Sequence, residues 1–358
     1  MEYNELEKQI NECEKQIRDR IDDYYDTIHA ILGFCSLWFF DTSTQKNRPN
    51  IKVFQGRRLS KITNIVNADN LSNEVCPDLG IVVQDDSGIL GEVKKNFPKD
   101  GDERRKTIFN QLKSYDHELD WWPTPDGKLK SHNIVLLIHQ TTSRRAQDYY
   151  YEKNNKGEIK FTRSFSICQF NRSDQRVPYF FFQVVSGKIN NTLGNVDLDN
   201  GVQVPMEPLS KLYAKSKLYD AEPPLSYLLH LIWEHVVIPI LSEDENFGRL
   251  RKNQNIELKL KVDDIVERLN EGFSFIHWHR NYPEHQPRIP QKEWIQKACN
   301  LLVKVGKAKW ISNGEELTIS FTKIGNIVDY FIRLEAEDQA KTIIKPMFPL
   351  DNNELNKK

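Results

Sequence analysis

The chain contains 358 residues, so a typical domain size of about 150 residues predicts two or three domains. Hydrophobic residues make up 39% of the sequence, which excludes a disordered chain, and a formal charge of −1, from 50 basic and 51 acidic residues, excludes a uniformly basic nucleic-acid coat. Five widely separated cysteines without a Cys-x-x-Cys pair exclude a disulfide framework and favour the reducing cytoplasm.

Membrane insertion is not expected, because no stretch approaches the roughly 18 uninterrupted apolar residues of a membrane span. The most apolar stretch, 225–241, is interrupted by His230, Glu234 and Pro239, and is predicted to be a buried helix. The amino terminus begins with acidic residues and has no hydrophobic signal region. The sequence therefore predicts a soluble cytoplasmic protein with no membrane partner.

Apolar residues recur at helical spacing through residues 1–32, among them Ile10, Ile17 and Ile28. Nine acids and four bases between residues 2 and 26 give this segment a net charge of −5. The pattern predicts an amphipathic helix, with two alternatives. The helix packs on its own domain, or it forms a coiled coil that makes a homodimer, although Arg20 interrupts the apolar seam.

Short apolar runs alternate with helical stretches up to residue 187, a pattern typical of an α/β or α+β domain. We expect a mixed sheet flanked by helices, and assign residues 1–187 to this first domain. The expected strands are 79–83, 89–93, 134–138, 165–170 and 179–185, and the expected helices are 103–119 and 143–152.

The second half of the sequence predicts a small domain after a linker. Residues 188–255 are rich in turn-forming residues and are assigned to a linker that carries the helix 225–241. Residues 256–345 read as helix, helix and a hairpin across Asn313-Gly314, which resembles a mostly helical winged helix-turn-helix domain. Polar residues 346–358 are expected to be a disordered tail.

Charged residues interrupt one apolar hairpin of the first domain. Glu92 and Lys94 share one face of the strand that ends there, because side chains alternate between the faces of a strand. The hairpin returns this strand beside Asp78, which follows Pro77. Carboxylates and carbonyl oxygens are ligands that Mg²⁺ prefers, so we expect Asp78, Glu92 and the Val93 carbonyl to bind Mg²⁺ or Mn²⁺. Such a site suits phosphodiester hydrolysis, with Lys94 stabilising the developing charge.

The tripeptide acid-x-Lys alone is uninformative, because Asp126-Gly127-Lys128 and two other segments also match it. Only the Glu92 copy follows a Pro-Asp by a single hairpin, and the next helix carries Gln111 and Tyr115 at i and i+4. These residues resemble the PD-(D/E)XK nuclease superfamily over roughly residues 60–185.

The resemblance implies a restriction-endonuclease-like fold and a Mg²⁺-dependent endonuclease in restriction or anti-phage defence. It implies that Asp78 and Glu92 are metal ligands, that Lys94 is the catalytic lysine, and that Gln111 and Tyr115 are accessory catalytic groups. Some members use a further acid from the preceding helical region, and its identity stays open. The candidates are Glu74, Asp22 and Asp23.

Basic residues cluster beside the expected metal site and again in the small domain. Residues 94–113 carry a net charge of +4 and residues 288–309 a net charge of +5, which suits the phosphate backbone of duplex DNA. The candidate nucleic-acid-binding residues are Lys95, Arg104, Arg105, Lys113, Arg288, Lys292, Lys297, Lys304 and Lys307.

Other functional readings stay open. The protein is alternatively a catalytically silent DNA-binding regulator or a subunit that binds a partner protein, with the nuclease-like domain as scaffold, or a nuclease that cleaves RNA. His139 ends an apolar strand, where a lone histidine is more often structural than catalytic. His277, His279 and His285 lack the fourth ligand and the firm scaffold of a zinc site.

Overall fold

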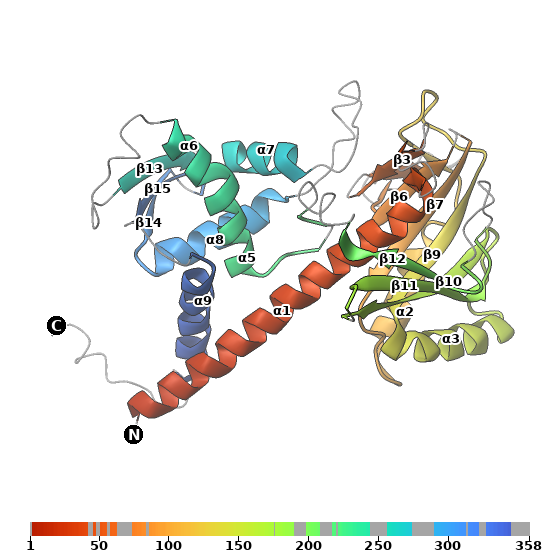
Figure 1. Cartoon of the computed structure of the whole chain (residues 1–358), viewed down its shortest axis with the longest axis horizontal. Helices are drawn as coiled ribbons and strands as arrows, with labels where there is room; N and C mark the ends of the chain where they lie inside the picture. The colour runs from red at the N-terminus through yellow and green to blue at the C-terminus, as the bar shows by residue number, and fades with distance from the viewer. Residues whose placement is uncertain are drawn as a thin grey trace. The chain divides into compact units, whose positions relative to one another are not determined.

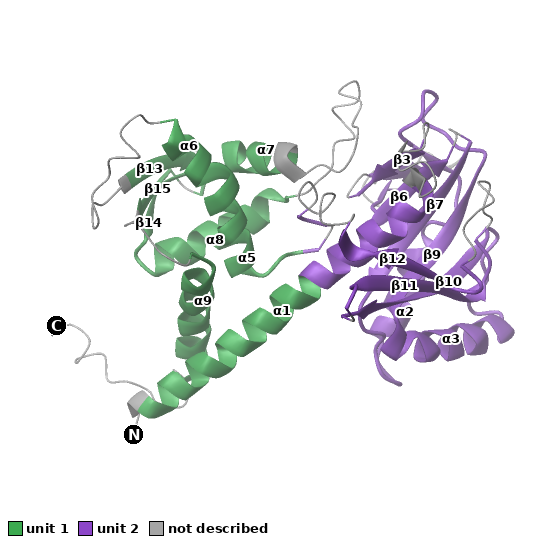
Figure 2. Cartoon of the chain, in the orientation of Figure 1, with its two compact units in different colours: residues 1–24, 222–272, 290–358 green, residues 25–221, 273–289 purple. Residues whose placement is uncertain are grey.

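The computed structural model divides the chain into two compact units (Figure 2). Unit 1 comprises residues 1–24, 222–272 and 290–358, and unit 2 comprises residues 25–221 and 273–289. The predicted α/β class, with a large mixed sheet flanked by helices, is confirmed. The structure describes residues 2–41, 46–47, 51–55, 58–62, 74–83, 86–174, 176–189, 198–207, 217–219, 221–243, 256–273, 290–312, 314–321 and 327–344.

Unit 2 is built on a seven-stranded sheet with the order β12-β11-β10-β9-β7-β6-β3 (Figure 1). Strands β7, β9 and β10 are parallel, and the pairs outside them are antiparallel. Parallel neighbours need a crossover, which α2 (Arg104–Lys113) and α3 (Gln140–Asn155) provide. The strands are β3 (Ile51–Phe54), β6 (Leu79–Val83), β7 (Ser87–Lys94), β9 (Ser131–His139), β10 (Phe165–Ser173), β11 (Tyr179–Gly187) and β12 (Val202–Pro205).

The two faces of this sheet pack against different helices, because successive side chains of a strand point to opposite faces. On one face, Leu90 of β7 shares a core with Phe109 of α2. On the other, Phe34 of α1 (Glu2–Phe39) packs against Phe182 of β11, with ring centroids 5.9 Å apart. The even-numbered residues of β7, including Glu92 and Lys94, therefore lie on the face that α2 covers.

Two small sheets that the sequence did not reveal complete unit 2. One pairs two-residue strands after α1, and the other has the order β5-β4-β8. Strands this short carry too few residues to show a periodic pattern. They are β1 (Phe40–Asp41), β2 (Lys46–Asn47), β4 (Leu59–Lys61), β5 (Glu74–Val75) and β8 (Leu119–Asp120).

Unit 1 combines helices with a three-stranded antiparallel sheet of order β13-β15-β14. The predicted hairpin is present as β14 and β15, and β13 adds a third strand. Besides residues 2–24 of α1, its elements are α5 (Leu225–Ile232), the π-helix η2 (Trp233–Val237), α6 (Ile238–Ser242), β13 (Ile256–Lys261), α7 (Val262–Phe273), α8 (Lys292–Lys304), β14 (Ala308–Ser312), β15 (Glu316–Phe321) and α9 (Ile327–Ile344).

The structure divides the chain differently from the predicted boundary at residue 187. The apolar stripe of α1, including Ile10 and Ile17, is buried within the chain. Arg333 of α9 forms 3.0 Å ion pairs with Glu7 and Glu14 of α1. The first two-thirds of α1 thus pack with the carboxy-terminal elements, which sequence periodicity cannot show because it identifies an apolar face and not the surface that covers it.

The predicted linker 188–255 contains parts of both cores. Strand β12 extends the large sheet of unit 2, and the helical stretch 225–242 contributes Leu228 and Leu231 to the core of unit 1. Among the described helices, this stretch alone has the length and composition to cross a membrane, but half of it is buried inside the protein. The predicted tail 346–358, Arg288 and the three clustered histidines lie outside the described residues.

Substitution of Gly80 in β6 tests the packing of the β6–β7 hairpin. A Cβ at this position would lie 2.1 Å from the ring of Phe54, which is fully buried. We expect Gly80→Ala to destabilise the protein by about 1–3 kcal/mol through overpacking, measured by urea unfolding. The double variant Gly80→Ala/Phe54→Leu should lose less unfolding free energy than the two single variants together, because the clashing ring is gone. Strictly additive losses would show that the new methyl group does not contact Phe54.

Candidate active site

Asp78 and Glu92 converge because the antiparallel ladder between β6 and β7 places them opposite each other. The last ladder pair is Leu79 with Gly91, so continuing the register by one residue puts Asp78 opposite Glu92. Both side chains lie on the face that α2 covers, and their residues are 5% and 0% exposed. The predicted meeting of the two acids is therefore present in the structure.

Pro77 explains why the ladder stops here. One residue further along the register it would face Val93, and proline has no N–H to donate to that strand. The Val93 N–H instead donates to Asp78 Oδ2 at 2.8 Å. The N–H and C=O of one strand residue point to the same side, so the Val93 carbonyl is directed to the edge where Asp78 lies. This geometry fits the predicted role of that carbonyl as a third oxygen ligand.

Lys94 joins the two carboxylates. Its Nζ lies 2.9 Å from Glu92 Oε2 and 3.5 Å from Asp78 Oδ2, and its side chain remains 27% exposed. Burial lowers the pKa of Lys94, but the charges of Asp78 and Glu92 outweigh this effect and raise it. The ammonium therefore stays charged and occupies the position between the two acids.

Tyr115 reaches the same cluster. Its hydroxyl donates to Glu92 Oε1, and the Tyr115 hydroxyl oxygen also lies 3.3 Å from the Cys76 carbonyl oxygen. The tyrosine is almost completely buried, and its own carbonyl accepts a bond from His132 Nε2 at 2.7 Å in the tautomer that carries the proton there. Both oxygens of Glu92 thus have a partner, one from Tyr115 and one from Lys94.

The environment disfavours a free negative charge on Glu92. Burial and the nearby charge of Asp78 raise the pKa of Glu92 to about 8, against the opposing effects of Lys94 and Tyr115. Burial and the same carboxylates also raise the pKa of Tyr115 far above its usual value, so the phenol stays protonated. A divalent cation held by Asp78 and Glu92 would add positive charge and so favour the ionised form of Glu92.

Gln111 and Tyr115 do not share a helix face as the sequence predicted. The helix α2 ends at Lys113, six residues before the predicted end, and Tyr115 follows in a turn closed by its N–H to the Leu112 carbonyl. Gln111 is half-buried on α2, and within the described residues its side chain makes no hydrogen bond to Asp78, Glu92 or Lys94.

The basic residues predicted beside the site are largely engaged within the chain. Lys113 donates to Asp116 and to the Lys160 carbonyl. Arg105 lies over the rings of Phe97 and Tyr149, at 5.3 and 4.6 Å from their centroids. Arg104 is exposed and forms an ion pair with its neighbour Asp102.

The basic residues of unit 1 form ion pairs too. The ammonium groups of Lys292 and Lys297 lie 2.8 Å from Asp263 and 2.7 Å from Glu222, and Lys304 pairs with Asp338 of α9. Within the described residues, Lys307 makes no ion pair. The positive charge predicted from residues 288–309 is therefore reduced by acids that lie far away in the sequence.

Asp26 of α1 is a residue that sequence reasoning missed. Its carboxylate lies 3.7 Å from Lys95, directly after the motif, and 2.6 Å from Arg172 of β10. The predicted candidates for a further acid lie elsewhere: Glu74 pairs with Arg58 beside the small sheet, and Asp22 and Asp23 are exposed on the part of α1 in unit 1. Helix periodicity marks Asp26 only as one of nine acids, so no sequence signal singles it out.

His139 has structural partners. The Thr141 N–H donates to its Nδ1 at 3.4 Å, which caps the start of α3, and its ring packs edge-on against Phe170. Within the described residues, no group of three or more His, Cys, Asp or Glu side chains gathers as a metal site. A cation held by Asp78 and Glu92 therefore needs the Val93 carbonyl and water as its remaining ligands, a coordination that Mg²⁺ accepts.

No protein-family model, no curated protein and no solved structure matches this chain. The assignment of a function therefore depends on the geometry of the site.

The bond from Tyr115 to Glu92 gives a direct test of this geometry. Tyr115→Phe keeps the buried ring but leaves Glu92 Oε1 without its donor, and should cost about 1–3 kcal/mol of stability in metal-free buffer. Tyr151→Phe is the control, because Tyr151 is 46% exposed, and it should change the free energy of unfolding by less than about 0.5 kcal/mol. Equal effects in urea unfolding would show that the Tyr115 hydroxyl does not bind Glu92.

Proposed function

We propose that the chain is a divalent-metal-dependent endonuclease that hydrolyses phosphodiester bonds of DNA, with its active site at Asp78, Glu92 and Lys94. The observation that carries the proposal is the convergence of two buried carboxylates and one lysine on neighbouring strands, with the Lys94 ammonium 2.9 and 3.5 Å from the two acids. Gathering two acids and an ammonium group in a buried place costs free energy, and such sites are often functional.

The residues fit a small hard cation. Asp78 and Glu92 would bind it from adjacent strands, and the Val93 carbonyl would add an oxygen at the edge where the ladder has ended. When bound, the cation supplies Lewis acidity to the scissile phosphate and to water. Tyr115 would hold one oxygen of Glu92, so that the other is oriented toward the site.

Lys94 has two positions in this proposal. In the structure it neutralises both acids, and it is the part of the cluster with access to solvent. If Asp78 and Glu92 held a cation, Lys94 would no longer be needed to neutralise them, and its partly exposed ammonium would be free to turn toward solvent. There the ammonium can donate to a phosphate oxygen and stabilise the charge that develops as the bond breaks.

Unit 1 supports DNA as the substrate. Two helices, α7 and α8, followed by the hairpin β14–β15 have the order of a winged helix-turn-helix, with α8 as the candidate recognition helix. Its Lys292 and Lys297 are 42% and 55% exposed in their ion pairs. Exposed pairs contribute only about 0–1 kcal/mol, so DNA phosphates can replace the acids as partners.

A second candidate function is a catalytically silent regulator with a nuclease-like scaffold. The observation that favours it is that both oxygens of Glu92 already have donors and that the residue is fully buried. A buried polar network with all partners satisfied can serve the fold alone. Metal binding and cleavage separate the two functions.

Metal binding is measured first. Saturating Mg²⁺ or Mn²⁺ should raise the melting temperature of the wild-type chain, because a ligand at 100 times its Kd stabilises the folded state by about 2.7 kcal/mol. Asp78→Asn should abolish the shift. Asp126→Asn is the matched control, since Asp126 is an exposed acid of another acid-x-Lys tripeptide, and should keep it. A wild-type chain with no metal-dependent shift would favour the silent scaffold.

Cleavage is measured on supercoiled plasmid. The wild-type chain should nick it with Mg²⁺ or Mn²⁺ and not with EDTA, and Lys94→Gln should lower the rate by about 10²–10³-fold, as for loss of a transition-state stabiliser. Lys128→Gln, an exposed lysine of the tripeptide 126–128, should keep the rate. Plasmid binding without nicking supports the regulator, and cleavage of labelled RNA but not DNA makes RNA the substrate. Normal nicking by Lys94→Gln would refute the proposed mechanism.

A further inference from the structure

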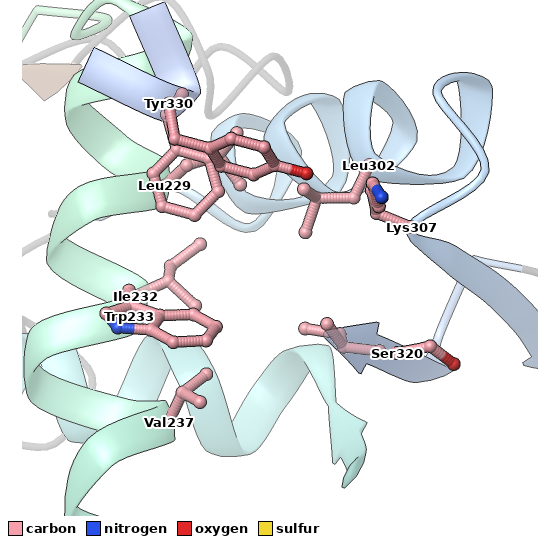
Figure 3. Close-up of a pocket in the computed structure, with 10 residues that line it drawn as sticks. Leu229, Ile232, Trp233, Val237, Leu302, Lys307, Ser320 and Tyr330 are labelled. Atoms are coloured by element: carbon pink, nitrogen blue, oxygen red, sulfur yellow. The ribbon is translucent and has the colours of Figure 1, made fainter. Parts of the chain in front are cut away.

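A second candidate binding site lies within unit 1, apart from the acids and lysine described above. It is a cavity of about 120 Å³ between the helical stretch α5–η2, the helices α8 and α9, and strand β15. Figure 3 shows its lining side chains arranged around an open centre. All of its lining residues belong to unit 1, and the site is independent of the proposed nuclease function.

The wall of the cavity is apolar and buried. Leu229, Ile232, Val237 and Leu302 line it, and each is at most 5% exposed. An engineered apolar cavity of about 150 Å³ binds benzene, so apolar walls of this kind suit an aromatic ring. The volume here suits one ring of about that size.

Aromatic side chains frame the same cavity. The rings of Trp233 and Phe331 meet nearly edge to face, at 69° and with centroids 6.3 Å apart, and the Tyr330 ring lies 5.7 Å from that of Phe331. Aromatic pairs prefer such tilted arrangements.

The backbone beside the cavity contains a π-helical turn. The π-helix η2 (Trp233–Val237) contains the bond from the Ile238 N–H to the Trp233 carbonyl, five residues earlier. Pro239 follows and has no N–H with which to continue an α-helical ladder, which favours the wider turn. Trp233 and Val237, the two ends of this turn, both line the cavity. Turns of this kind are frequent at functional sites.

One side of the cavity is polar. Figure 3 shows the Tyr330 hydroxyl and the Lys307 ammonium on the same side of the open centre. Lys307 is exposed at its rim, and within the described residues it has no carboxylate partner, in contrast to Lys292, Lys297 and Lys304. One ammonium with a neighbouring hydroxyl matches a ligand group that carries one negative charge and accepts hydrogen bonds.

We propose that this cavity binds a small carboxylate with a single aromatic ring. The ring occupies the apolar part lined by Ile232, Val237 and Leu302, beside the contacting rings of Trp233 and Phe331. The carboxylate accepts hydrogen bonds from Lys307 and Tyr330. The sequence predicted that Lys307 contacts DNA, whereas here its partner is the carboxylate of the small ligand.

Calorimetric titration of the full chain tests the proposal, with sodium phenylacetate as the probe and phenylacetamide as its neutral analogue. The wild-type chain should bind phenylacetate saturably at one site. Lys307→Gln should weaken the binding of phenylacetate by about five- to tenfold and that of phenylacetamide by less than about twofold, because only the carboxylate loses an ionic partner. Lys309→Gln, an exposed lysine on β14 that does not line the cavity, should bind phenylacetate like the wild type.

A filling variant locates the binding. Val237→Phe should abolish binding of both probes, with melting curves used to check that it folds. Lys307 is exposed, so Lys307→Gln keeps the test decisive if Val237→Phe does not fold. Absence of saturable phenylacetate binding by the wild type would overturn the proposal. Equal affinities of wild type and Lys307→Gln for phenylacetate would overturn it too, and would leave at most a site for neutral apolar rings.

Discussion

The hydrogen bond from the Val93 N–H to the Asp78 carboxylate is the constraint on which the candidate active site depends. It closes the hairpin at the point where Pro77 has no N–H to offer and the ladder between β6 and β7 ends. Asp78 is thereby held opposite Glu92. Lys94, two residues after Glu92 on the same face of β7, reaches both acids. A single missing backbone donor thus opens an edge of the sheet and places a carboxylate there.

The same cluster can serve stability or chemistry, depending on what neutralises the acids. In the structure Lys94 and Tyr115 satisfy both oxygens of Glu92, and burial raises the pKa of that carboxyl. If Asp78 and Glu92 held a divalent cation, Lys94 would no longer be needed to neutralise them and would be free to turn toward solvent. The proposed nuclease therefore has a lysine that protects the site without metal and assists the reaction with metal.

The sequence predicts the parts of the site that depend on residues close together in the chain. Side-chain alternation along a strand and the register of a short hairpin bring Asp78, Glu92 and Lys94 together, so the meeting of these three residues was predictable. The sequence placed Tyr115 on a helix predicted to extend to residue 119. In the structure α2 ends earlier, and Tyr115 reaches Glu92 from the turn that follows it. Asp26 and the acids that pair with the lysines of α8 come from distant segments. Such pairs form through tertiary packing, which periodicity and local charge do not encode.

Crystals grown with Mn²⁺ would test the central claim most directly, through anomalous scattering at the manganese absorption edge. The account predicts a peak within ligand distance of the Asp78 and Glu92 carboxylates and the Val93 carbonyl, at about 2.0–2.2 Å as for a small hard cation. It also predicts that the Lys94 ammonium moves away from between the acids. A structure with Lys94 still bridging Asp78 and Glu92, and no manganese beside them, would contradict it.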